Sequence, residues 1–134
     1  MADVSVFAID PGETTGWCFY SSYDCTTGVT EIHHGFHIAK LLDEFTPDQV
    51  VIELMPQKMA QKISNIVFQC KEGVRLYLQK HPHYGYAEIA PGNWKPVMKR
   101  EKLPFKMKTQ HEKDAYRMAR FWLYEVGAVP RPME

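Results

Sequence analysis

Three carboxylates and one imidazole stand out in this 134-residue sequence, because each one ends an apolar run or opens an amphipathic stretch. Asp10 follows the run VFAI and precedes a Pro-Gly turn, and Glu53 ends the run VVI. His111 and Asp114 are three residues apart, which places them on one face if this stretch is helical. Gathered in one place, such side chains repel one another and need a cation, and oxygen-rich ligand sets suit Mg²⁺ or Mn²⁺ better than Zn²⁺. Two such ions can activate a water molecule and stabilise the leaving oxygen in phosphodiester cleavage.

Each of these residues also has a local explanation. Asp10 could simply form a turn with the Pro-Gly pair, and Glu53 could be a surface acid at a strand end. His111 and Asp114 could cap a helix N-terminus or stabilise its dipole. Each of these explanations accounts for its own residue or pair only. None of them explains why all four positions carry side chains of this kind. We therefore predict a metal site formed by Asp10, Glu53, His111 and Asp114.

The elements that must position these residues follow from hydrophobic periodicity. Alternating or compact apolar runs predict strands over residues 4–10, 15–20, 28–36, 48–53 and 84–90, and helical spacing predicts helices over 37–45, 57–79 and 109–125. Residues 91–107 are predicted to form a connection, with a single turn around Trp94, which we expect to pack this connection down. The order βββαβαβα predicts an α/β domain over residues 1–134, with one five-stranded mixed sheet flanked by helices.

This order suggests how the four residues meet. If the first and fourth strands are parallel neighbours, Asp10 and Glu53 emerge at the same carboxyl edge, where open α/β sheets bind ligands. His111 and Asp114 share a helix face with Ala115 and Met118, which indicates that this face points toward the sheet.

The net charge of zero hides an asymmetry along the chain. Residues 1–57 carry nine acidic side chains and one basic side chain, whereas residues 58–134 carry fifteen basic and seven acidic side chains. The basic excess is steepest over residues 95–113, where it comprises Lys95, Lys99, Arg100, Lys102, Lys106, Lys108 and Lys113. Such a segment attracts a polyanion, although a solvated basic loop has the same composition.

Composition argues against several other classes of protein. No apolar run approaches the roughly 18 residues of a membrane span, and the N-terminus has no basic region typical of a signal peptide. The three cysteines form no disulfide framework or CxxC site, so we expect a cytoplasmic protein. His33 and His34, in the predicted strand 28–36, and His37 are expected to be structural, since adjacent strand residues point to opposite faces.

Four stretches of the chain, FAIDPGETTGW, VVIE, IAPGNWKPVMK and HEKDAYRMA, together resemble the RuvC-like Holliday-junction resolvases of the ribonuclease H-like superfamily. The resemblance implies a ribonuclease H-like fold and a dimeric, Mg²⁺-dependent endonuclease that nicks branched DNA symmetrically. Asp10, Glu53 and Asp114 match the metal-binding carboxylates of the family, and His111 matches its fourth catalytic position. The family's DNA-contacting lysines correspond to Lys95, Lys106 and Lys108.

Other features depart from the family pattern or extend it. The aromatic wedge expected shortly after the glutamate is replaced by Pro56, and the glycine-rich basic loop is replaced by KREKLPFKMK. The chain is short, as in phage or viral members. By analogy with the family, the helix over residues 57–79 would form the dimer contact, with the candidates Met59, Ile63, Ile66 and Phe68.

These observations favour a nuclease resolving Holliday junctions or other branched DNA, with Mg²⁺ as cofactor and Mn²⁺ as a substitute. The same site could instead act on RNA–DNA hybrid, flap or single-stranded substrates. A further alternative is a catalytically silent DNA-binding module. The presence of Asp10, Glu53 and Asp114 argues against it. A nucleotide-binding module related to actin-like ATPases would need a second matching subdomain, for which 134 residues leave no room.

Overall fold

The computed structural model describes residues 4–32, 34–54 and 61–130. The elements follow one another in the order β1 (Val6–Asp10), β2 (Thr15–Tyr20), β3 (Cys25–Thr30), α1 (Gly35–Phe45), β4 (Gln49–Glu53), α2 (Gln61–Lys80), β5 (Gly85–Ile89), α3 (Pro91–Met98) and α4 (Gln110–Glu125). The five strands form one sheet in the order β3-β2-β1-β4-β5. Strands β1, β2 and β3 pair antiparallel, and β4 is parallel to both β1 and β5. The predicted α/β class with a five-stranded mixed sheet is therefore confirmed.

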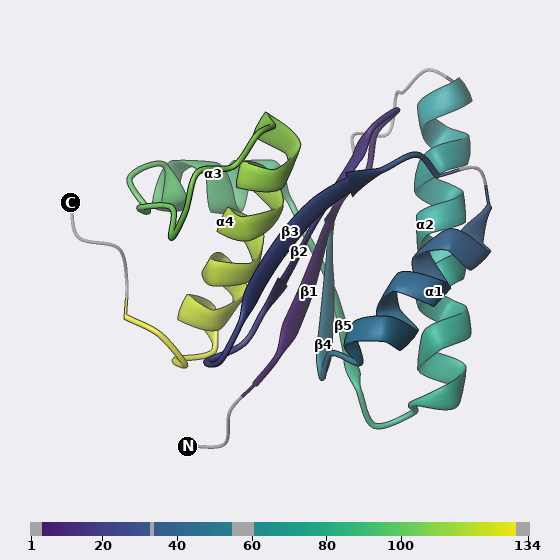
Figure 1. Ribbon diagram of the computed structural model, residues 1–134, viewed down its shortest axis with the longest axis horizontal. Helices are drawn as coiled ribbons and strands as arrows, with labels where there is room; N and C mark the ends of the chain where they lie inside the picture. The colour runs from purple at the N-terminus through teal and green to yellow at the C-terminus, as the bar shows by residue number, and fades with distance from the viewer. Residues whose placement is uncertain (1–3, 33, 55–60, 131–134) are drawn as a thin grey trace.

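Two helical layers cover the sheet, with α1 and α2 on one face and α3 and α4 on the other (Figure 1). Alternation along β1 divides its side chains between two cores: Val6 and Ala8 pack in the core that contains α4, and Phe7 and Ile9 pack in the core that contains α1 and α2. Because side chains alternate along a strand, Asp10 continues the first set. Its carboxylate therefore belongs to the α3–α4 face.

The third strand was predicted in the wrong place, over 28–36 rather than Cys25–Thr30. The turn lies earlier, over residues 21–24, where the Ser21 hydroxyl accepts hydrogen bonds from the backbone N–H groups of Tyr23 and Asp24. His34 is consequently not a strand residue but the N-cap of α1, and its Nδ1 accepts from the Phe36 N–H. His33 lies outside the described residues.

The connection over 91–107 begins with an eight-residue helix, α3, rather than a single turn. Pro91 occupies the first helical position, where its fixed φ favours helix and no N–H is needed. Trp94 and Met98 are one turn apart and both fully buried, so packing holds the helix despite Pro96 within it. The expectation that Trp94 packs the connection down is thus confirmed.

The other helices agree with the prediction to within a few residues. Helix α2 begins at Gln61 in the described part of the chain, so the predicted start at residue 57 cannot be compared with it, because residues 55–60 are not described. Among the residues described, no helix combines the length and apolar character needed to cross a membrane.

Candidate functional site

Asp10 and Glu53 lie side by side at the carboxyl ends of β1 and β4. The parallel register pairs Ile9 with Ile52, so the two acids follow at the same level of the sheet. Each is the last residue of its strand, and each is almost fully buried, with 7% and 8% of its surface exposed. The predicted juxtaposition of these two residues is therefore present.

Burial dominates the electrostatics of both acids. Burial raises the pKa of Asp10. The hydrogen bond to His111 opposes this rise, and the negative charge of Asp114 adds to it. Burial likewise raises the pKa of Glu53, and the Asp10 charge adds to this rise, whereas the hydrogen bond from Trp94 opposes it. The charge of Lys95 lowers the pKa of both acids. The site thus confines negative charge, which Lys95 and His111 partly offset.

Helix α4 brings His111 into contact with Asp10, whereas Asp114 lies near enough for its charge to act on Asp10 and Glu53 but contacts neither of them among the bonds of the described residues. His111 Nδ1 lies 3.3 Å from Asp10 Oδ2, and the Asp114 side chain accepts a hydrogen bond from Gln110 at 2.8 Å. The helix is capped by Thr109, whose hydroxyl accepts from the Glu112 N–H at 3.1 Å. Because Thr109 provides the cap, neither His111 nor Asp114 is needed as a cap of α4.

A glycine on β2 allows this close approach. Gly16 pairs with Asp10 in the β1–β2 register, and a Cβ atom placed on it would lie 2.5 Å from the backbone carbonyl atoms of His111. Any side chain at this position would push the start of α4 away from the sheet. Sequence reasoning did not identify Gly16 as part of the site, since a glycine after a turn has many explanations.

The donor set suits a hard divalent cation that keeps part of its hydration shell. Among the described residues, no group of three or more His, Cys, Asp and Glu side chains is close enough to form a complete metal site. Mg²⁺ is typically held by one or two carboxylates and completes its octahedron with waters and substrate phosphates. Asp10 and Glu53, which are adjacent and oxygen-bearing, meet that requirement.

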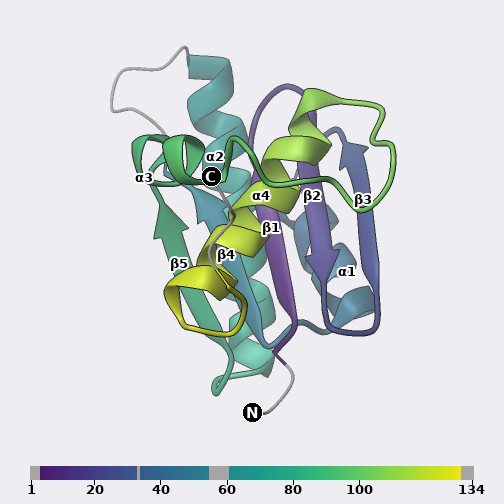
Figure 2. The same cartoon turned by 90° about the vertical axis from the view of Figure 1, so that its left-hand side faces the viewer.

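Uncharged and acidic residues hold the basic connection between α3 and α4 against the rest of the domain. Met107 is buried, and Glu101 accepts a hydrogen bond from Arg120 Nε at 2.8 Å. Arg120 also donates to the Tyr20 hydroxyl at 2.9 Å, which ties the connection to β2. The predicted DNA-contacting residues that are exposed are Lys95, Lys99, Arg100, Lys102, Lys106 and Lys108, whereas Lys113 is half-buried. Figure 2 views the molecule from this side, with the connection running over the α3–α4 layer.

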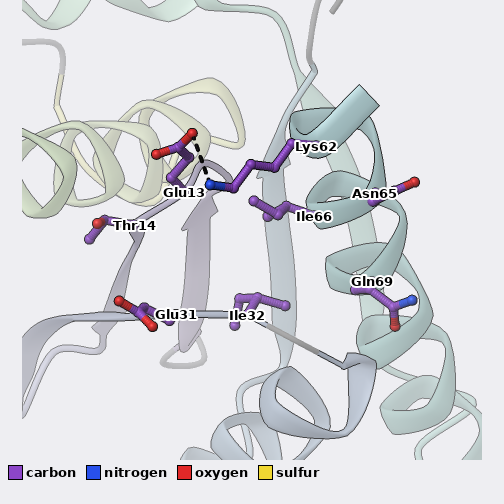
Figure 3. Close-up of a pocket in the computed structure, with 8 residues that line it drawn as sticks. All are labelled: Glu13, Thr14, Glu31, Ile32, Lys62, Asn65, Ile66 and Gln69. Carbon is purple, nitrogen blue, oxygen red and sulfur yellow. Dashed lines mark ion pairs between the residues drawn. The ribbon is translucent and has the colours of Figure 1, made fainter. Parts of the chain in front are cut away.

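A separate pocket of about 540 Å³ opens near the start of α2 (Figure 3). Its lining includes Glu13, Glu31 and Lys62, and an ion pair of 3.4 Å joins Lys62 to Glu13. None of the predicted site residues lines it. It is therefore distinct from the site around Asp10 and Glu53.

The raised pKa of Asp10 predicts a pH-dependent gain in stability for Asp10→Asn in the absence of metal. The pKa of Asp10 is higher in the folded protein than its ordinary value of 3.8. Above pH 3.8 the ionised side chain therefore lowers the free energy of unfolding. We expect the variant to be more stable at pH 7 by about 1 kcal/mol, or roughly 3–5 °C in Tm. The difference should shrink as the pH falls toward the ordinary pKa of 3.8 and vanish below it, because the wild-type carboxyl then takes up a proton in both the folded and the unfolded protein. Calorimetric melting in EDTA between about pH 3 and 8 measures it, and a lower Tm of the variant at pH 7 would contradict this account of the site.

Comparison with solved structures identifies proteins of the same architecture. The chain is similar to Thermus thermophilus RuvC in complex with a Holliday junction substrate, with a TM-score of 0.68, 16% identity, and coverage of 97% of this chain and 99% of that one. A further Thermus thermophilus RuvC structure gives a TM-score of 0.65 at 15% identity, covering 96% and 99% of the two chains. The yeast mitochondrial Holliday junction resolvase Ydc2 gives 0.53 at 13% identity, covering 88% and 78%.

Neither a protein-family model nor a curated protein sequence matches the chain. At such low identities the structural similarity establishes the fold and not the activity. The chain has the ribonuclease H-like fold of these resolvases, as the resemblance in its sequence predicted.

Proposed function

We propose that this protein is a divalent-metal-dependent endonuclease that resolves Holliday junctions or other branched DNA. The observation that carries the proposal is the pair of buried, adjacent carboxylates, Asp10 and Glu53, which lie with Asp114 and His111 on the face that carries the basic connection. The ribonuclease H-like fold supports it, because one protein of this fold is a RuvC structure containing a Holliday junction substrate.

In this proposal the catalytic residues are Asp10, Glu53, His111 and Asp114. Asp10 and Glu53 would hold Mg²⁺, with Mn²⁺ as a substitute, and His111 and Asp114 would join them as ligands if the ion draws the start of α4 closer. Bound there, the cation would supply Lewis-acid activation of a water and stabilise the leaving oxygen. Asp10 and Glu53 provide carboxylates fixed at the strand ends, and His111 orients Asp10 through the 3.3 Å contact. The exposed cations of the connection and Lys95 would hold the phosphate backbone beside these groups.

The experiment that tests this function is a cleavage panel. Purified protein with Mg²⁺ or Mn²⁺ should cut a labelled four-way junction faster than a linear duplex of the same sequence, and EDTA should stop the reaction. Flap, single-stranded and RNA–DNA hybrid substrates in the same panel separate the alternative substrate classes. A protein that binds the junction but cuts none of these substrates would be a silent DNA-binding module.

We further propose that the active species is a homodimer formed through α2. Of the predicted contact residues, Phe68 is 59% exposed and Ile63 is half-buried. Ile66 is only 8% exposed and packs in the core that contains α1 and α2, so the expectation that it is an exposed candidate for the interface is wrong. Met59 lies outside the described residues.

Phe68→Asp should therefore convert a dimer into a monomer, because a charge replaces the exposed aromatic of the proposed interface at little cost to the core. Sedimentation velocity on both proteins measures this change, and Phe36→Asp, which alters an aromatic exposed to 61% on α1, is the matched control. A wild-type protein that sediments as a monomer would contradict the proposed interface.

The cellular setting that we propose for this protein is the reducing cytoplasm of a bacterium or of a phage-infected cell.

A further inference from the structure

One buried hydrogen bond joins α3 to the end of β4. Trp94 Nε1 donates to Glu53 Oε2 at 2.9 Å, and the two residues are 1% and 8% exposed. They lie 41 positions apart in the chain. An indole N–H is a donor only, and a carboxylate acceptor makes the bond charge-assisted and stronger than a neutral one. The contact therefore ties one oxygen of Glu53 to a fully buried ring.

The rest of the environment leaves the other oxygen available. Within residues 4–32, 34–54 and 61–130, no hydrogen bond reaches Oε1 of Glu53. The backbone at this point is also fixed, because the Leu54 N–H donates to the Ile89 carbonyl at 2.8 Å and extends the β4–β5 ladder past Glu53. With the backbone and Oε2 both held, the torsions of the glutamate side chain lose most of their freedom.

Trp94 is itself held rigidly. Its ring and Met98, one helical turn later, are fully buried in the core that contains α4. The ammonium of the next residue, Lys95, lies 5.5 Å from the centroid of the Trp94 ring. One short helix thus fixes the orientation of Glu53 and places a cation beside the same site.

We propose that Trp94 is a positioning residue, whose N–H orients Glu53 so that Oε1 is presented to the divalent cation. The inference rests on the proposed function, because it assigns Trp94 a role only if Glu53 is a metal ligand. Hydrogen-bond partners of ligating groups set the orientation of those groups, and their loss typically weakens metal binding by 10- to 100-fold. A purely structural Trp94 would contribute to packing and leave metal affinity unchanged.

Trp94→Phe separates these two roles, because it keeps an aromatic ring in the core and beside Lys95 but removes the N–H. We expect Mn²⁺ binding about 10-fold weaker than in the wild type, measured by the electron paramagnetic resonance signal of free Mn²⁺. Trp122→Phe makes the same chemical change in a half-buried tryptophan of α4, and it should bind Mn²⁺ as the wild type does. Circular dichroism melting establishes that all variants are folded.

A second variant covers the case in which Trp94→Phe does not fold. The benzothienyl analogue of tryptophan, incorporated at position 94, has nearly the same shape and replaces only the N–H by sulfur. It should also weaken Mn²⁺ binding by about 10-fold. Wild-type Mn²⁺ affinity in the analogue, or in a folded Trp94→Phe protein, would overturn the positioning role.

An Asp10→Asn sample in the same titration separates this failure from failure of the proposed function. If Asp10→Asn abolishes Mn²⁺ binding and both position-94 variants bind as the wild type does, only the role of Trp94 falls. If the wild type binds no Mn²⁺, or Asp10→Asn binds it as tightly as the wild type, the metal site and the inference that rests on it fall together.

Discussion

Asp10→Asn is expected to slow Mg²⁺-dependent cleavage of a four-way junction by about 1,000-fold, or roughly 4 kcal/mol in activation free energy. Asp10 is buried, follows in register beside Glu53 and lies 3.3 Å from His111, so its charge stands at the centre of the proposed site. An amide keeps the shape of the side chain and removes the negative charge that would hold the cation. Single-turnover rates on a labelled junction measure the effect.

The same variant should bind the junction within about twofold of the wild type in EDTA, because the proposed phosphate contacts lie on the basic connection. Glu13→Gln is the matched control: it neutralises an acid three positions along the chain whose side chain is 65% exposed and paired with Lys62. That control should cut at the wild-type rate. If Asp10→Asn cuts as fast as the wild type, the assignment of the catalytic site is wrong.

Replacing Lys99, Lys102, Lys106 and Lys108 by Gln is expected to weaken junction binding by roughly 1,000-fold at 0.1 M salt. Each lysine that neutralises a phosphate contributes about 0.9 to the slope of log K against log salt, so the quadruple variant should lose about 3.6 from that slope. The double variant at Lys106 and Lys108 should lose about 1.8. Fluorescence anisotropy between low and moderate salt measures both quantities.

Folding should be unaffected in these variants, because all four lysines are exposed. The double variant Lys40→Gln, Lys80→Gln removes as much charge from the α1–α2 layer as the double variant at Lys106 and Lys108 removes from the connection, and it should leave the slope unchanged. An unchanged slope in the quadruple variant would remove the connection from the proposed DNA-binding surface.

Much of the fold followed from the sequence because its signals were local and mutually consistent. Alternation along residues 4–10 predicted the strand β1, and the same alternation places Asp10 on the face of Val6 and Ala8. The compact run before Glu53 predicted a buried strand, and β4 is buried along its length. Juxtaposition of Asp10 and Glu53 then followed from the expectation that these two strands are parallel neighbours.

The errors arose where tertiary contacts outweighed local signals. Residue 28 was predicted to begin the third strand, but in the structure Gly28 lies within β3, where the absence of a side chain makes room for the Trp17 ring. Residues 91–107 were predicted to form a connection with a single turn around Trp94, yet burial of Trp94 and Met98 holds the eight-residue helix α3 at its start. The bond from Trp94 to Glu53 joins residues 41 positions apart and leaves no periodic signal in the sequence.

The anchoring of the α3–α4 connection has a consequence for how such a protein can change over time. Leu103 and Met107 pack in the core, and Glu101 is tied to Arg120, so the residues that maintain the path of the chain differ from those that display positive charge. Selection can therefore exchange, add or remove individual lysines without disturbing the protein's shape. In a lineage of such chains, we expect the surface cations to diversify quickly while their apolar and ion-paired neighbours drift slowly.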